Sequence, residues 1–202
     1  MKVVGVGCGP GMLTEEAIRA IQEAPAICGS RRAIALARAY IRRDCPVREV
    51  RDFSAPHQCP PDSVLLSTGD PLLAGLGYRG DSVIPGISSL QVASARLGIP
   101  LDRITIIDAH ARDAHAAIGG VCEELARGTI VFLLADPRFP LDRLAAALPD
   151  DVKVIACEDL GYPGERITCG TPRSPPAIRS RLFVLVIGRF TVPDRVEQTS
   201  EQ

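Results

Sequence analysis

The sequence has few aromatic residues and almost no net charge. It contains no Trp, 3 Tyr and 5 Phe, and its 23 basic side chains are balanced by 24 acidic ones. Single-stranded nucleic acids bind to aromatic platforms in positively charged grooves, and duplexes require an excess of Lys and Arg on the bound face. The chain offers neither feature, so we expect no nucleic acid partner.

The sequence also lacks cysteine pairs and long apolar runs. Its 7 cysteines include no C-x-x-C pair, which argues against a zinc knuckle, a disulfide framework or any other metal site. No stretch approaches the roughly 18 apolar residues of a membrane helix, and the N-terminus has no apolar signal-peptide core. We therefore expect a cytoplasmic protein with mostly buried cysteines and no membrane contact.

Short apolar runs alternate with longer amphipathic segments in the first half of the 202-residue chain. Thr14 and Ser30 carry hydroxyl groups suited to capping a helix and stand where two of the helices should begin. This alternation predicts a mostly parallel sheet covered by helices. The expected strands are residues 3–6, 26–28, 63–67, 82–84 and 104–107, and the last of them would close this half of the chain.

The second half is richer in strands. Predicted helices at residues 114–126 and 141–148 flank the apolar run 129–135, and three further strand candidates follow with little helix between them. Such a series indicates an antiparallel or mixed sheet. We predict an α/β protein of two domains, residues 1–109 and 110–192, followed by a polar, frayed tail at 193–202.

A glycine-rich stretch, GVGCGPG at residues 5–11, directly follows the first predicted strand. A dinucleotide-binding fingerprint would need glycine where Pro10 stands, and it would need an acidic residue at the end of the second strand. A phosphate-binding P-loop would need Lys-Ser or Lys-Thr after the glycines. Two interpretations remain: a purely structural turn, or a turn that brings bare backbone to a ligand at the carboxyl edge of the sheet.

Two more glycine-containing loops follow predicted strands, STGDP at residues 67–71 and IPGISS at residues 84–89. Asp70 supplies the one carboxylate of these loops, suited to an ammonium, a hydroxyl or backbone N–H groups. The hydroxyls of Ser88 and Ser89 stand where a helix begins and can cap it or bind a ligand. Together the loops predict a site for a polar small molecule that carries no phosphate.

The segments GVGCGPGMLT, STGDPLLAGLG and VIPGISSLQVASARLGIP, in this order and spacing, resemble the tetrapyrrole methylase family. Within this family the sequence is most similar to the branch that methylates C5 of cobalt-precorrin-7, which shares CGSRRAI at residues 28–34 and EDLGYPGERI at residues 158–167. The resemblance covers about residues 1–190. It implies two α/β domains that bind folded S-adenosylmethionine in a cleft between them, usually in a homodimer.

The resemblance also implies which residues contact S-adenosylmethionine. In the first domain these are in the three loops, and in the second they follow two predicted strands. The implied contacts are Cys8, Pro10, Gly69, Asp70, Leu73, Ser88, Ser89, Leu134, Leu160 and Gly161.

The sequence departs from the family pattern in three places. The segment 78–82 is shorter than usual, Ala74 replaces an aromatic residue, and DAHAR at residues 108–112 replaces a motif that resembles S-L-H-G-R. The last change keeps the two side chains expected to be catalytic, His110 and Arg112. His110 is our candidate for proton handling, because imidazole carries protons near neutral pH. Arg79 and Arg138 are the other arginines expected to bind substrate carboxylates, whereas Arg31, Arg32, Arg42 and Arg43 are expected on solvated helix faces.

The function implied is S-adenosylmethionine-dependent C-methylation of a corrinoid at C5 in cobalamin synthesis, with C15 methylation and decarboxylation left to a separate partner protein. Methylation at another ring position, diphthamide-type methylation of a protein, and a nucleotide-binding module without catalysis remain as alternatives. Binding of S-adenosylmethionine without affinity for NAD or ATP would separate the enzyme from the module.

Overall fold

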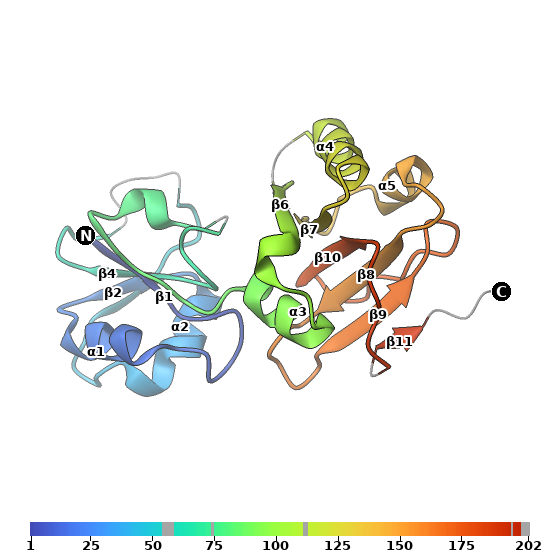
Figure 1. Cartoon of the computed structure of the whole chain (residues 1–202). Helices are drawn as coiled ribbons and strands as arrows, with labels where there is room; N and C mark the ends of the chain where they lie inside the picture. The colour runs from blue at the N-terminus through green and yellow to red at the C-terminus, as the bar shows by residue number, and fades with distance from the viewer. Residues whose placement is uncertain (54–58, 74, 111–112, 195, 199–202) are drawn as a thin grey trace. The chain divides into compact units, whose positions relative to one another are not determined.

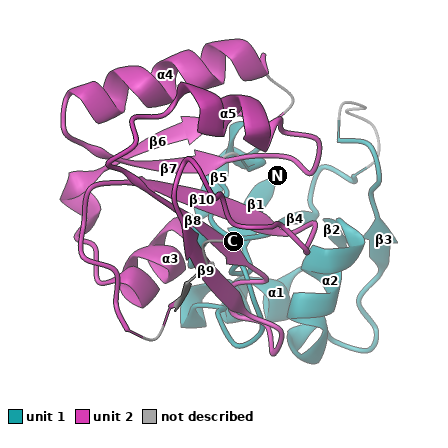
Figure 2. Cartoon of the chain, turned by 90° about the vertical axis from the view of Figure 1, so that its right-hand side faces the viewer, with its two compact units in different colours: residues 1–89 teal, residues 90–202 magenta. Residues whose placement is uncertain are grey.

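The computed structural model describes residues 1–53, 59–73, 75–110, 113–194 and 196–198. The chain divides into two compact units, Met1–Ser89 and Leu90–Gln202, which Figure 2 shows in different colours. The boundary therefore precedes the one expected at residue 109 and leaves the segment 90–109 in the second unit.

The first unit contains a five-stranded sheet in which every pairing is parallel. Its strands lie in the order β3-β2-β4-β1-β5. Short β3 was not expected from the sequence, because its residues Val47, Arg48 and Glu49 are exposed and carry no apolar alternation. The strands are β1 (Lys2–Gly5), β2 (Ile27–Gly29), β3 (Val47–Glu49), β4 (Val64–Ser67) and β5 (Ser82–Ile84).

Two helices cover one face of this sheet, α1 (Glu15–Glu23) and α2 (Arg31–Ala37) (Figure 1). The predicted caps are confirmed, because Thr14 Oγ1 accepts from Ala17 N at 3.1 Å and Ser30 Oγ accepts from Ala33 N at 3.2 Å. Apolar residues of both helices pack on Val4, Val64 and other strand residues that point to this face. Short 3-10 turns follow at Arg38–Tyr40 and, after β4, at Gly77–Arg79.

The second unit contains a six-stranded mixed sheet in the order β11-β9-β8-β10-β7-β6. β10 pairs antiparallel with both β7 and β8, and β8 pairs antiparallel with β9, whereas β6 is parallel to β7. The predicted mixed sheet is confirmed. The strands are β6 (Ile104–Asp108), β7 (Ile130–Leu134), β8 (Lys153–Glu158), β9 (Arg166–Gly170), β10 (Phe183–Gly188) and β11 (Glu197–Gln198).

Two sequence-based expectations are corrected here. The strand at residues 104–107 was expected to close the first half, but β6 pairs with β7 of the second sheet along its whole length. The tail was expected to be frayed, but Glu197 and Gln198 pair in parallel with Thr168 and Cys169 of β9. Both corrections concern which strand is the partner, which a local apolar pattern does not specify.

The helices of the second unit are α3 (Ser89–Leu97), α4 (Ala114–Ala126) and α5 (Leu141–Ala147), with a 3-10 turn at Leu101–Arg103. Figures 1 and 2 show α4 and α5 on one side of the sheet and α3 on the other. Val121, Leu125 and Leu144 of α4 and α5 pack on Leu133 and Leu185 in a continuous apolar core. In the described part of the chain, no helix has the length and apolar character needed to cross a membrane.

Candidate functional site

The three glycine-containing loops of the first unit start at neighbouring strand ends. β1 lies between β4 and β5, and Gly5 at its end is level with Ser67 of β4, while Val4 is level with Ile84 of β5. Because the strands are parallel, the loops that follow them leave the same edge of the sheet. The structure therefore brings together the three segments that the sequence singled out, residues 5–11, 67–71 and 84–89.

Backbone hydrogen bonds join these loops to one another. Gly69 N donates to Gly7 O at 2.8 Å, and the two residues form an isolated antiparallel bridge. Cys8 N donates to Ile87 O at 2.9 Å, which ties the first loop to the third. The first loop thus lies between the other two and bonds to both.

Two glycines allow the loops to approach this closely. A Cβ on Gly86 would lie 2.3 Å from Gly69 O and 2.9 Å from Gly5 Cα, and a Cβ on Gly5 would lie 2.6 Å from Gly86 N. These contacts involve backbone atoms, which cannot rotate away as a flexible side chain could. Only glycine fits at these two positions.

Asp70 fixes the second loop to the third. Its Oδ2 accepts from Gly86 N at 3.1 Å, and its Oδ1 accepts from Leu72 N at 2.8 Å within its own loop. Of the three kinds of partner predicted for this carboxylate, the structure shows backbone N–H groups. Asp70 therefore stabilises the loop geometry, and its remaining lone pairs are what it can offer to a ligand.

Arg32 contacts one of the three loops, which the sequence reasoning did not predict. It was expected on a solvated helix face, but it is half-buried and its guanidinium donates to Thr68 Oγ1 in the second loop at 2.9 Å. Arg31, Arg42 and Arg43 are exposed, as expected. The one sequence signal was its place in CGSRRAI at residues 28–34, and this segment also contains Arg31.

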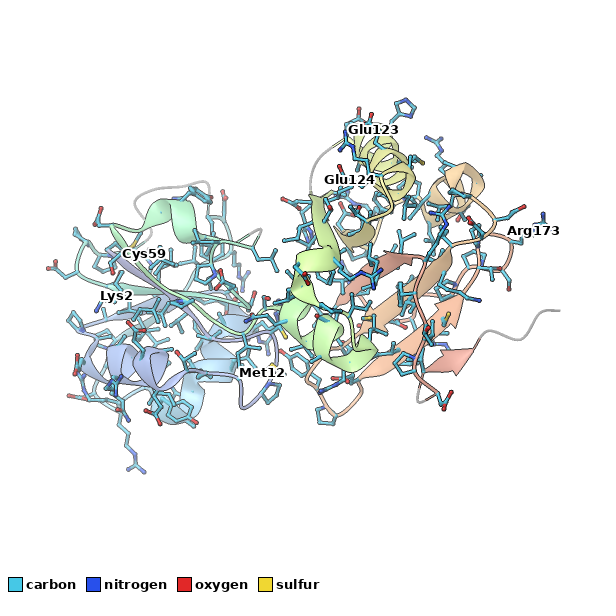
Figure 3. All side chains as sticks on the ribbon, viewed as in Figure 1. Lys2, Met12, Cys59, Glu123, Glu124 and Arg173 are labelled. Carbon is cyan, nitrogen blue, oxygen red and sulfur yellow. The ribbon has the colours of Figure 1, made fainter. Side chains whose placement is uncertain are left out.

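The other residues implied to contact the cofactor in this unit are placed along the same loops. Pro10 is exposed, Cys8, Leu73 and Ser89 are half-buried, and Ser88 is 4% exposed. The Cys8 thiol donates to the Met12 thioether, with 3.6 Å between the sulfur atoms, and Met12 is labelled in Figure 3. These placements agree with a role at the edge of the sheet, and the contacts themselves remain predictions.

The residues implied in the second unit lie along one edge of its sheet. Leu134 at the end of β7 pairs with Asp108 of β6, and Ala109 N donates to Leu134 O at 2.8 Å. Leu185 of β10 pairs with Leu133 of β7 on one side and Ala156 of β8 on the other, so the ends of β7 and β8 differ in level by one residue. One edge of the sheet therefore carries all the implied residues of this unit. His110 follows β6, Leu134 ends β7, and the loop with Leu160 and Gly161 follows β8.

His110 is held near the end of β6. Its backbone N donates to Asp108 Oδ1 at 3.0 Å, and its Nδ1 lies 3.9 Å from the same oxygen, with the side chain 54% exposed. An exposed imidazole beside a carboxylate can carry a proton. Arg112, the other residue expected to be catalytic, lies outside the described residues, as does Ala74.

Arg79 and Arg138, the other arginines expected to bind substrate, differ in their surroundings. The Arg79 guanidinium lies 5.4 Å from the centre of the Tyr78 ring, and Tyr78 is 75% exposed. Arg138 is 95% exposed, with its Nε 3.9 Å from Asp136 Oδ1. The Tyr78 ring therefore limits the movement of the Arg79 guanidinium. The guanidinium of Arg138 is almost wholly in solvent.

Two thiols near these elements, those of Cys59 and Cys157, have raised pKa values. Burial, with a hydrogen bond to Cys28, raises the pKa of Cys59 to about 12, although Arg48 and Arg79 oppose the shift. Burial also raises the pKa of Cys157 in β8 to about 12. A thiol acts as a nucleophile only when it is ionised, so neither of these cysteines is prepared for covalent catalysis.

The loop after β8 has an unusual backbone. Asp159 has φ +48° and Gly161 has φ +80°, and Asp159 is the one non-glycine residue with positive φ in the part of the chain that the structure describes. Such a conformation costs about 1–3 kcal/mol and is found most often at functional sites. Ser180 Oγ stabilises it by donating to Asp159 Oδ1 at 2.8 Å.

Solved methyltransferase structures share this architecture. The precorrin-6Y methylase of cobalamin biosynthesis from Archaeoglobus fulgidus is 32% identical, with a TM-score of 0.74 over 95% of this chain and 98% of that one. The uroporphyrin-III C-methyl transferase from Thermus thermophilus, solved with S-adenyl homocysteine, is 20% identical with a TM-score of 0.67, over 93% and 91%. The fold is therefore that of the tetrapyrrole methylases, with two α/β units.

Sequence comparison gives the family. The profile of the Tetrapyrrole (Corrin/Porphyrin) Methylases matches residues 2–174, and the chain belongs to this family. The precorrin-6Y C(5,15)-methyltransferase [decarboxylating] of Mycobacterium tuberculosis is 26% identical over 99% of this chain and 54% of its own length. The cobalt-precorrin-7 C(5)-methyltransferase of Salmonella typhimurium is 27% identical over 83% of this chain and 88% of its own. The chain thus spans about half the length of the first curated relatives.

Proposed function

We propose that this chain is an S-adenosylmethionine-dependent C-methyltransferase of cobalamin biosynthesis that methylates C5 of a cobalt-precorrin-7 or precorrin-6B-type corrinoid. The observation that carries the proposal is the convergence of three glycine-containing loops at the carboxyl edge of a parallel sheet, in a chain of this family. The names of the relatives that act at C(5) or C(5,15) support this choice of ring carbon.

The residues of the loops fit S-adenosylmethionine. This cofactor carries no phosphate, and the loops carry no lysine that would grip one. They offer backbone N–H and C=O groups together with the hydroxyls of Ser88 and Ser89, which suits an amino-acid group with both donors and acceptors. Gly69 has positive φ, +68°, and among the described groups only Ser88 Cα, at 3.9 Å, would lie within 4 Å of a Cβ there.

When bound, S-adenosylmethionine supplies a methyl group on a positively charged sulfur, and its transfer requires alignment at about 3 Å and exclusion of water. In this proposal Gly69 and Ser88 hold the polar end of the cofactor, and Asp70 keeps their loops in register. Leu73, Leu134 and Leu160 supply apolar surface that excludes water. His110 takes up the proton that the methylated ring carbon releases.

We test the proposal by incubating the protein with a cobalt-precorrin-7-type corrinoid and S-adenosylmethionine labelled in its methyl group. Mass spectrometry of the product is expected to show a single labelled methyl group, and nuclear magnetic resonance to place it at C5. In equilibrium dialysis we expect binding of S-adenosylhomocysteine and none of NAD or ATP. A protein that bound NAD or ATP and left the corrinoid unlabelled would contradict the proposal.

The substrate carries many carboxylates, and we propose that Arg79 and Arg138 bind them. Replacing Arg79 with glutamine removes a charged hydrogen-bond donor, so the KM for the corrinoid is expected to rise about tenfold while the affinity for S-adenosylhomocysteine stays unchanged. Steady-state kinetics and calorimetry measure the two quantities.

Arg51→Gln is the control for Arg79→Gln, because Arg51 is also an arginine of the first unit and its side chain is 90% exposed beside Glu49. This variant should leave both quantities unchanged. If Arg79→Gln weakened cofactor binding selectively, the assignment of Arg79 to the substrate would be wrong.

We further propose that the protein works as a homodimer in the cytoplasm, and that a separate decarboxylase methylates C15. Support for separate C15 chemistry comes from the Salmonella relative, whose printed name specifies C(5) alone. Sedimentation of the protein tests the dimer.

A further inference from the structure

The loop at residues 159–165 of the second unit is held by a carboxylate outside the roles assigned so far. Glu165 Oε2 accepts from Gly161 N at 2.7 Å, and Glu165 Oε1 accepts from Arg96 Nε at 2.6 Å. A second guanidinium nitrogen of Arg96 lies 3.4 Å from Oε2. The Glu165 carboxylate therefore connects the peptide of Gly161 to Arg96, which is 69 residues before Glu165 in sequence.

The loop requires such a connection because its backbone is unusual. Asp159 and Gly161 both have positive φ, and a glycine with no side chain has no packing of its own to hold it in place. The hydrogen bond from Gly161 N to Glu165 restricts the peptide of the residue that is implied to contact the cofactor. The side chain of Glu165 is only 21% exposed, so this contact is shielded from competing water.

Arg96 fixes the position of Glu165 from outside the loop. It lies in the last turn of α3, and it forms a charge-assisted hydrogen bond with the Glu165 carboxylate, which is the strong class of hydrogen bond. The same helix begins at Ser89, one of the residues implied to bind the cofactor. The anchor of the 159–165 loop therefore belongs to a helix turn of the same unit as the loop.

We infer that Arg96 and Glu165 are positioning residues that hold the 159–165 loop in the conformation that binds the adenosine portion of S-adenosylmethionine. This inference rests on the proposed function, and it assigns roles to two residues that are not among the implied cofactor or substrate contacts. Loss of the pair should weaken cofactor binding and leave the chemical step largely intact, because the loop must then be ordered at the moment of binding.

The test compares Arg96→Ala, Arg96→Lys and Glu165→Gln in the full chain. Calorimetry with S-adenosylhomocysteine should show a Kd about tenfold higher for Arg96→Ala and Glu165→Gln, and a smaller loss for Arg96→Lys, which keeps the charge. The KM for S-adenosylmethionine should rise in parallel while kcat and the KM for the corrinoid stay within about twofold. Amide hydrogen exchange should become faster at residues 159–165 and stay unchanged in β10.

Asp150→Asn is the matched control, because it removes one partner of another arginine–carboxylate pair of the same unit, with Arg173, whose two side chains are mostly exposed. It should change none of these quantities. An unchanged Kd for S-adenosylhomocysteine in Arg96→Ala and Glu165→Gln, with or without a lower Tm, would show that the pair is merely structural. If the unaltered protein bound no S-adenosylhomocysteine, the proposed function would fail, and hydrogen exchange would still decide whether the pair orders the loop.

Discussion

Replacing Gly86 with alanine is expected to abolish detectable binding of S-adenosylhomocysteine and to destabilise the first unit. The added Cβ would lie 2.3 Å from Gly69 O and 2.9 Å from Gly5 Cα, so the second and third loops must separate. Forced overpacking against atoms that cannot move aside costs about 3 kcal/mol of stability. A misplacement of about 1 Å in an active site can lower the catalytic rate about 100-fold. Calorimetry measures the binding, and thermal unfolding should show a Tm lower by about 6–12 °C.

Gly119→Ala is the control for this substitution, because it makes the same chemical change where no described atom lies within 4 Å of the added Cβ. Gly119 is inside helix α4, where alanine is favoured over glycine by about 1 kcal/mol. The control should therefore raise the Tm slightly and leave binding unchanged. Normal binding by Gly86→Ala would mean that the close approach of the loops is not needed for the cofactor.

The convergence of the three loops was predictable from the sequence for a physical reason. Each of the segments GVGCGPG, STGDP and IPGISS follows a short apolar run, and strands that are parallel in one sheet direct their following loops to one edge. The order of strands that makes β1 the neighbour of both β4 and β5 is not a local property, and it came from the structure. The sequence thus indicated the loops, and the sheet determined which of them touch.

Errors arose where the outcome depended on a distant partner. The run at residues 104–108 has the apolar character of a strand in either domain, and only its pairing with β7 assigns it to the second sheet. In the sequence, Arg32 cannot be distinguished from its neighbouring arginine, and its contact with Thr68 is visible only in the structure. The backbone partner of the Glu165 carboxylate was likewise found only in the structure, because propensity does not reveal it.

The second unit contains a buried carboxylate whose loss should have a large effect on stability. Glu158, at the end of β8, is 1% exposed, and its Oε1 accepts from Arg179 N and Ser180 N, each at 2.6 Å. Its Oε2 accepts from the Arg166 guanidinium, which also donates to Ala177 O at 2.8 Å. This one side chain therefore fastens the segment that leads into β10 onto the strand pair β8–β9.

Glu158→Gln is expected to lower the free energy of unfolding by about 3–5 kcal/mol, because it leaves Arg166 without its counter-charge and turns an amide NH2 group toward existing donors. For a chain of this size the Tm should fall by about 10 °C, as measured by circular dichroism. The control is again Asp150→Asn, where a hydrogen bond from Arg173 holds the pKa of the carboxyl below its usual range. Arg173 lies on the surface (Figure 3), and solvent screens that pair so strongly that its loss should leave the Tm unchanged. Equal Tm values for the two variants would show that Glu158 is not the anchor of this segment.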